Sequence, residues 1–146
     1  MKAILRVLLS LLICGLTTIE ARADDNPLTA DSKSTYHGVK RIILRTAETM
    51  PEEKYSFKPV DTVRTFGQIL GHIADSQYTF CSAVLGEKSP GLRIEKTKTS
   101  KTDLIAALEA AFGHCDRAYA SLTDASGTET VKFMGGKPKL GVLSVN

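Results

Sequence analysis

Apolar residues recur every three to four positions in three separate segments of the chain. This spacing places the apolar side chains of each segment on one face of a helix. The pattern predicts three amphipathic helices, over residues 31–50, 65–86 and 101–123. The apolar positions include Tyr36, Val39, Ile42, Ile43, Ala47 and Met50 in the first segment, Phe66, Ile69, Leu70, Ile73, Phe80, Cys81 and Val84 in the second, and Leu104, Leu108, Ala111, Phe112, Cys115, Ala118, Tyr119 and Leu122 in the third.

Start and stop signals support the second and third helices. Thr65 is followed three positions later by Gln68, which is a capping-box pattern, and Gly86 is a typical helix stop. Ser100 and Asp103 form a similar N-terminal signature before the third segment. The second helix is therefore the most clearly delimited element.

The connecting segments contain few strand signals. Pro51 ends the first helix, and residues 51–59 are expected to form an ordered loop whose two aromatic residues pack on the bundle. Residues 131–138 are the most plausible place for a single short hairpin. A last helix is expected to begin near Leu140 and to reach only about two turns by Asn146. Because three apolar faces call for a fourth partner, the predicted class is all-α, an up-down four-helix bundle with its fourth helix reduced to a stub.

The N-terminal residues have the pattern of a secretory signal peptide. Lys2 and Arg6 precede an apolar run over residues 7–16, and small residues before Asp24 predict cleavage after Ala23. The run is shorter than the roughly 20 residues of a membrane span. Cys14 offers the alternative of a lipoprotein, although the bulky residue before it disfavours that processing. We therefore expect an exported protein, periplasmic or secreted, with one helical domain over residues 24–146.

Charge excludes one class of partner. Removing the signal takes away Lys2, Arg6, Arg22 and Glu20, which lowers the formal net charge from +3 to about +1. The remaining chain has no basic stripe interleaved with aromatic residues, as nucleic-acid binding requires. We expect no nucleic-acid partner and, after signal cleavage, no membrane association.

Two cysteines remain after signal cleavage. Cys81 and Cys115 both fall on apolar helix faces. In an oxidising compartment they can form a disulfide, or both can be buried core thiols. The sequence leaves both alternatives open because it does not give the distance between their Cα atoms.

His72 is the principal candidate for chemistry. It lies on the flank of the second predicted helix, about 120° from the centre of the apolar face, where an imidazole can border a cavity between helices. Asp75, one turn further on, is expected either to orient that imidazole or to face water. His37 and His114 are interpreted as structural, since His37 lies on a charged face and His114 lies off the apolar face beside Cys115. The sequence contains no phosphate-binding loop, nucleophile elbow or zinc-finger cysteine pair.

Several segments, in order and with their spacing, resemble the DinB-like family. They are Met50–Glu53 with Tyr55, Phe57 and Pro59, then Arg64–Gly67, then Gly71–Asp75, and later Cys81–Gly86, Lys98–Asp103, Cys115–Asp116 with Tyr119, and Gly136–Ser144. The resemblance implies a four-helix bundle with a divalent metal ion, zinc, nickel or similar, held by three histidines. One of these lies on the second helix, and His72 matches it. The other two lie at H-x-x-x-H spacing on the last helix and have no counterpart up to Asn146.

The resemblance implies a metal-dependent transferase or hydrolase. The alternatives are a non-catalytic protein that binds a small molecule or acts as an accessory, and an inactive fragment, so enzymatic activity is left open. A homodimer is a further option. We expect weak metal binding by the chain as written, and an exposed apolar groove that includes Leu70, Ile73, Phe112 and Cys115.

Overall fold

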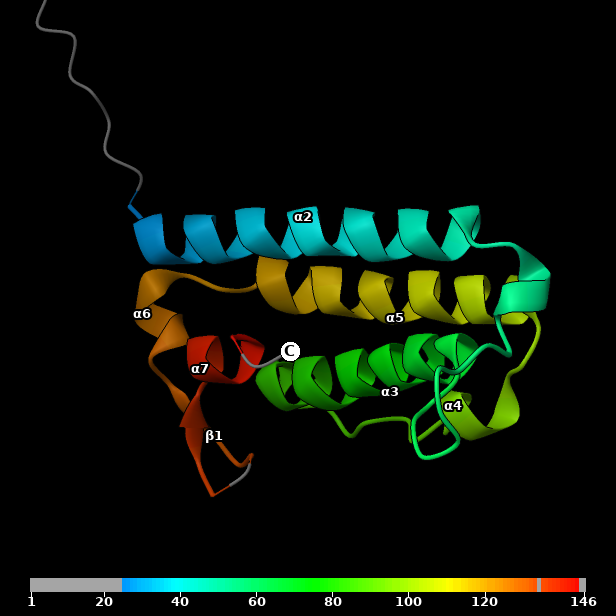
Figure 1. Ribbon diagram of the computed structural model, residues 1–146. Coiled ribbons are helices and arrows are strands. Elements are labelled where there is room, and N and C mark those ends of the chain that lie inside the picture. Colours follow the sequence, from blue (N-terminus) through cyan, green and yellow to red (C-terminus); the bar gives the residue numbers. More distant parts are fainter. Residues whose placement is uncertain (1–24, 134, 145–146) are drawn as a thin grey trace, which may run out of the picture.

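A computed structural model describes residues 25–133 and 135–144, and this part of the chain is helical apart from one small hairpin (Figure 1). The elements are α2 (Pro27–Thr49), the 3-10 turn η1 (Glu52–Lys54), α3 (Phe66–Leu85), α4 (Ile94–Thr97), α5 (Lys101–Ala120), α6 (Asp124–Gly127), β1 (Thr130–Val131), β2 (Lys137–Pro138) and α7 (Lys139–Leu143). The predicted all-α class is confirmed. The predicted signal peptide, with Cys14 and the cleavage site after Ala23, lies outside the described residues. None of the described helices has the length and hydropathy to cross a membrane.

The three long helices lie side by side, with α5 between α2 and α3 (Figure 1). Helices α3 and α5 run in the same direction, and α2 runs in the opposite one. The side chains of Leu104, Leu108 and Phe112 on α5 are fully buried because both neighbouring helices cover them. The short helix α7 packs against α3 at the end where α3 finishes. The molecule is thus a bundle of three long helices with a short last helix at one end. The expected up-down order is wrong for α3 and α5, because the segment between them, which contains α4, returns the chain to the end where α3 begins.

The local signals at the ends of α3 and α5 are confirmed. The Thr65 side chain accepts a hydrogen bond from the backbone N–H of Gln68, whose side chain returns one to the backbone of Thr65. Gly86 ends α3 with φ 71°, a left-handed conformation that favours glycine. Ser100 accepts from the backbone N–H of Asp103 at the start of α5. These ends were predictable because each cap lies within three residues of the group it satisfies.

Helix α2 starts four residues earlier than predicted. Its first N–H groups are capped by Asp124 of α6, which accepts from the backbone of Leu28 (3.2 Å) and Thr29 (2.7 Å) and from the Thr29 hydroxyl (2.6 Å). Pro27 provides a favourable first helical residue. The early start was missed because the cap lies about 95 residues away in the sequence.

Helix α4 was not predicted. The Asp75 carboxylate of α3 accepts hydrogen bonds from the backbone N–H groups of Ile94 (2.9 Å) and Glu95 (3.0 Å), which holds the start of α4 against α3. Gly71 permits this approach, because a Cβ atom at that position would lie 2.6 Å from the Glu95 Cα. The expectation that Asp75 orients His72 or faces water was therefore wrong. Its carboxylate is occupied by backbone donors.

Only one aromatic residue of the loop over residues 51–59 packs on the bundle. Tyr55 is buried, and its hydroxyl donates to the backbone oxygen of Ala47 (2.6 Å). Phe57 is 61% exposed, so the expectation for this residue was wrong.

The exposed apolar groove differs from the one expected. Leu70, Phe112 and Cys115 are buried because α5 lies between the other long helices. The exposed apolar residues of the long helices are instead Val39 and Ile42 on α2 (46% and 62%) and Ile69 on α3 (45%), with Leu28 at the start of α2. The single hairpin, with β1 antiparallel to β2, falls where the sequence allowed one.

Candidate functional site

His72 lies near the start of α3 and contacts α4. Its side chain is 49% exposed, and Nδ1 lies 3.1 Å from the Glu95 Oε2 atom. His72 thus borders a short helix that was not predicted, α4. A carboxylate beside one ring nitrogen is common around metal-ligating histidines.

Glu95 connects His72 to a third residue. Its second carboxylate oxygen, Oε1, accepts a hydrogen bond from Nε of Arg64 (2.8 Å). The Arg64 hydrogen bond is the main cause that lowers the pKa of Glu95, with a smaller contribution from His72, while partial burial opposes the shift. Glu95 is therefore ionised at neutral pH, with one oxygen directed to each partner.

Two open cavities border this cluster. One, of about 510 Å³, lies between the loop at Tyr55 and the starts of α3 and α4, and the other, of about 820 Å³, lies beside Arg64. Gln68 and Glu95 line both cavities. A small molecule therefore has room next to the carboxylate that contacts His72.

His72 fits one ligand position of a divalent metal site. The imidazole is accessible and lies against a carboxylate, as a ligating histidine requires. Within residues 25–133 and 135–144, however, no group of three histidine, cysteine or acidic side chains is arranged to hold a metal ion. The part of the chain that the structure describes thus supplies one candidate ligand and no complete set.

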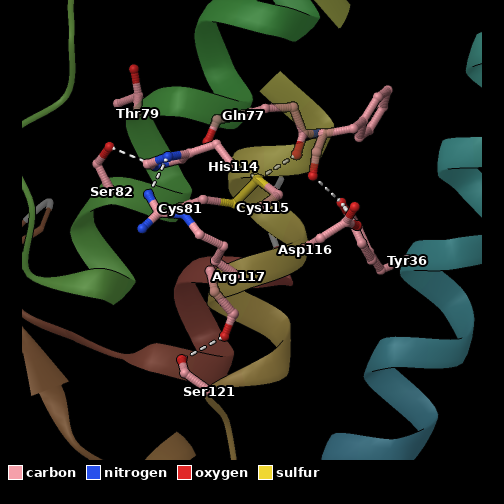
Figure 2. The surroundings of a disulfide bond; sticks show 12 residues. Tyr36, Gln77, Thr79, Cys81, Ser82, His114, Cys115, Asp116, Arg117 and Ser121 are labelled. Carbon is pink, nitrogen blue, oxygen red and sulfur yellow. Dashed lines mark hydrogen bonds between the residues drawn. A yellow bond between two sulfur atoms is a disulfide. The ribbon is translucent and has the colours of Figure 1, made fainter. Parts of the chain in front are cut away.

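His114 is a residue of α5 and lies beside the C-terminal end of α3, far from His72 (Figure 2). Its Nε2 atom is 3.0 Å from the Ser82 hydroxyl and its Nδ1 atom is 2.9 Å from Nη2 of Arg117. Arg117 also makes two hydrogen bonds to Glu87 (3.1 and 2.9 Å). Burial is the largest cause that lowers the pKa of His114, and the Arg117 charge adds to it.

The Ser82–His114 pair does not form a nucleophile and its base. Because arginine only donates, Nδ1 of His114 must accept, and the hydrogen of the neutral ring is on Nε2. That nitrogen donates to Ser82 and is unable to take its proton. Ser82 is also only 1% exposed. The contact was missed from the sequence because it joins residues 32 positions apart.

The cysteines form a disulfide. Cys81 of α3 and Cys115 of α5 are bonded, with their Cα atoms 5.2 Å apart, and both are fully buried (Figure 2). Of the two alternatives, the bridge is the correct one. It joins α3 to α5 one residue away from His114.

His37 is exposed on α2 and is directed to neither of the other histidines. Its neighbourhood is the ring of Tyr36 and the carboxylate of Asp116, which lies 2.6 Å from the Lys40 ammonium and 2.8 Å from the Tyr36 hydroxyl. Burial acts most strongly on the pKa of Asp116 and raises it, but the hydrogen bonds from Lys40 and Tyr36 prevail and lower it. The three histidines are thus separate, and His72 and His114 are about 15 Å apart along α3, since Ser82 lies ten residues after His72.

The fold and the His72 cluster define a helical-bundle domain with one candidate metal ligand at the start of its second long helix. Residues 36–145 match the DinB superfamily, and the chain belongs to this superfamily. No curated protein and no solved structure matched the chain.

Proposed function

We propose that this DinB-superfamily domain is exported and contributes His72 as a ligand for a divalent metal ion, zinc, nickel or similar, in a transferase or hydrolase. The observation that supports the proposal is the Nδ1 contact of His72 with Glu95, at 3.1 Å, on an accessible face of α3. In such a site the bound ion acts as a Lewis acid and lowers the pKa of a bound water or thiol. The contribution of this chain is to hold one imidazole and the cavities beside it.

The affinity expected from His72 alone is weak. Catalytic zinc sites usually have three protein ligands, and one imidazole supplies a fraction of that binding free energy. We therefore expect the 146-residue chain to bind zinc or nickel more weakly than micromolar. Activity then requires ligands in addition to the described residues.

Metal-induced line broadening tests the assignment of His72. Paramagnetic nickel(II) is titrated into the 146-residue protein, and the imidazole resonances of all three histidines are followed by NMR. We expect the His72 signals to broaden at the lowest nickel concentration. His37 is the matched control, since it is exposed on α2 and its ring makes no hydrogen bond to a carboxylate among the described residues. Equal broadening of the His37 and His72 signals contradicts the proposal. So does broadening of the Arg64 and Glu95 signals that is the same in His72→Ala as in the unchanged protein.

Calorimetry provides the second test. Micromolar or tighter zinc binding that His72→Ala abolishes would show that the chain completes its site with residues we have not identified. Binding that His72→Ala does not affect would place the metal elsewhere.

Export is tested by the N-terminus of the processed protein. Cleavage after Ala23 predicts that mass spectrometry of the exported fraction finds a chain that begins at Asp24. A chain that keeps residues 1–23, or carries lipid at Cys14, contradicts this part of the proposal.

A second candidate function is small-molecule binding without catalysis. It is favoured by a cavity of about 340 Å³ between α2, α3, α5 and α7, lined by aromatic and polar residues that include Tyr36, Gln77, Phe112 and Tyr119. This volume falls in the range of ligand pockets. Enhanced fluorescence of 1-anilinonaphthalene-8-sulfonate that is reduced by Val39→Glu, which lines the cavity, and not by Ile69→Glu, which does not, would support this function.

A further inference from the structure

We infer that Glu95 is a positioning residue that fixes His72 in the Nδ1–H tautomer, so that the neutral ring presents the electron pair of Nε2 to a cation. This inference rests on the proposed role of His72 as a ligand, and it assigns the residue that prepares it for that role.

The chemistry follows from the donor and acceptor properties of the two groups. An ionised carboxylate only accepts hydrogen bonds, so the hydrogen between Glu95 and His72 is on the histidine Nδ1 atom. In the neutral ring, the other nitrogen then has its lone pair exposed. A histidine side chain in water favours the opposite Nε2–H form, so the carboxylate changes which nitrogen is available. Ligation by Nε2 with Nδ1–H donated to a carboxylate is a recurrent arrangement in metal proteins.

The backbone and the side chain of Glu95 have separate tasks. Its backbone N–H donates to Asp75 (3.0 Å), as does that of Ile94 (2.9 Å), and these bonds hold α4 on α3. Gly71 allows the two backbones to approach closely. The attachment of α4 thus relies on Asp75 and Gly71, and the Glu95 carboxylate is directed to other partners.

The Glu95 carboxylate is itself held in place. Arg64 donates to Oε1 (2.8 Å), which leaves Oε2 directed at His72. The Glu95 side chain is only 22% exposed, so its conformations are restricted. A mobile carboxylate would not fix a tautomer, whereas one held at its backbone and at one oxygen does.

The test is the tautomer of His72 in the metal-free 146-residue protein. Long-range ¹H–¹⁵N NMR spectra at a pH where the rings are neutral distinguish the two forms. We expect Nδ1–H for His72 in the unchanged protein and a shift to the Nε2–H form in Glu95→Ala. Glu95→Gln should give the Nε2–H form as well, because Arg64 requires the single amide oxygen as its acceptor and the amide N–H group is then directed at Nδ1. His114 is an internal control that should show Nε2–H in all three proteins.

A second readout links the tautomer to metal. In the nickel titration we expect Glu95→Ala to require at least about tenfold more nickel to broaden the His72 signals. A loss of metal affinity of this size is typical when a residue that orients a metal ligand is replaced. A circular dichroism spectrum checks that α4 and the bundle remain folded, and Glu95→Gln replaces Glu95→Ala if the latter is unfolded.

The outcomes separate the two proposals. An Nε2–H tautomer of His72 in the unchanged protein, or an unchanged tautomer in Glu95→Ala, overturns the role of Glu95. The predicted tautomer together with no preferential broadening of His72 overturns the metal function and leaves the positioning role of Glu95 intact. A structural role alone would alter stability and leave the tautomer as it is.

Discussion

His72 and His114 lie at the boundary between α3 and a neighbouring element, and each ring has a charged side chain on its Nδ1 side. For His72 the neighbour is the carboxylate of Glu95, and for His114 it is the guanidinium of Arg117. The carboxylate requires a hydrogen on Nδ1, whereas the guanidinium requires a lone pair there. The sign of one neighbouring charge thus makes the first ring available as a ligand at Nε2 and turns the second into a donor to Ser82.

The two regions also differ in how they are held. His114 adjoins Cys115, which is covalently joined to Cys81, so its region is fixed by a disulfide. The His72 region is held by hydrogen bonds from Asp75 to α4 and by the close approach at Gly71. The region proposed to bind a ligand is therefore the less constrained of the two.

The largest expected effect comes from removing the disulfide. Closing a loop of 34 residues stabilises a folded chain by roughly 3 to 4 kcal/mol in the chain-entropy account. We expect reduction to lower the free energy of unfolding by about this amount, measured by urea denaturation with and without a phosphine reductant. The control is the Cys81→Ala/Cys115→Ala protein, whose stability should not respond to the reductant. A loss below about 1 kcal/mol on reduction would show that helix packing alone holds the His114 region.

The next effect concerns the contact between α3 and α4. In Gly71→Ala the new Cβ atom would lie 2.6 Å from the Glu95 Cα, so α4 must move, at a cost of about 1 to 3 kcal/mol. The matched control is Gly113→Ala on α5, where nothing lies within 4 Å of the added atom. That variant should gain about 0.5 to 1 kcal/mol, because alanine is the better helix former. Thermal melts of both proteins check the pair, and similar changes in both would mean that α4 is not closely packed on α3.

The comparison of these regions shows which structural features could be predicted from the sequence. The ends of α3 were predicted from Thr65, Gln68 and Gly86 because each cap involves near neighbours. Helix α4 was missed because its start is fixed by Asp75, which is 19 residues away from Ile94. Short helices of this kind depend on tertiary contacts and leave little periodicity to detect.

The same limit applies to the candidate site. Helical spacing placed His72 on the flank of an apolar face, and this placement was sound. Its partner Glu95 lies 23 residues further on, in a segment for which no helix was predicted. Spacing showed that Val39 and Ile42 belong to an apolar face, but it did not show that α5 would cover other residues of that face and leave these exposed.

A smaller effect is expected in the pH dependence at His114. Burial and the Arg117 charge lower its folded pKa below the ordinary value of 6.5. As pH falls through 6.5, the unfolded chain therefore binds a proton before the folded chain does, and stability falls. The stabilisation is present above pH 6.5 and is lost toward the lower folded pKa. His114→Gln should remove this part of the pH dependence in denaturation experiments.

Two charge variants determine the cause of the His114 shift. Arg117→Gln removes a lowering influence and should raise the pKa of His114 toward its ordinary value, although burial still holds it below. Glu87→Gln removes a raising influence and should lower it further. An NMR titration of the imidazole follows both. A shift of the same sign in the two variants would show that altered burial, and not charge, is responsible.

The smallest expected effect comes from Arg64→Gln, which removes one partner of Glu95 and leaves the other. Ion pairs on a protein surface contribute at most about 1 kcal/mol, and Arg64 is 49% exposed, so the loss of stability should be below that value. The pKa of Glu95 should rise toward 4.5, because the Arg64 hydrogen bond is the main cause that lowers it. At neutral pH the carboxylate remains ionised and its Oε2 atom still accepts from Nδ1, so His72 should keep the Nδ1–H tautomer. Carbon-detected NMR of the Glu95 carboxyl group and long-range ¹⁵N spectra of His72 measure both effects. If His72 instead changes to the Nε2–H form, the contrast with His114 depends on how Arg64 holds the carboxylate, and the sign of the neighbouring charge is insufficient to set the tautomer.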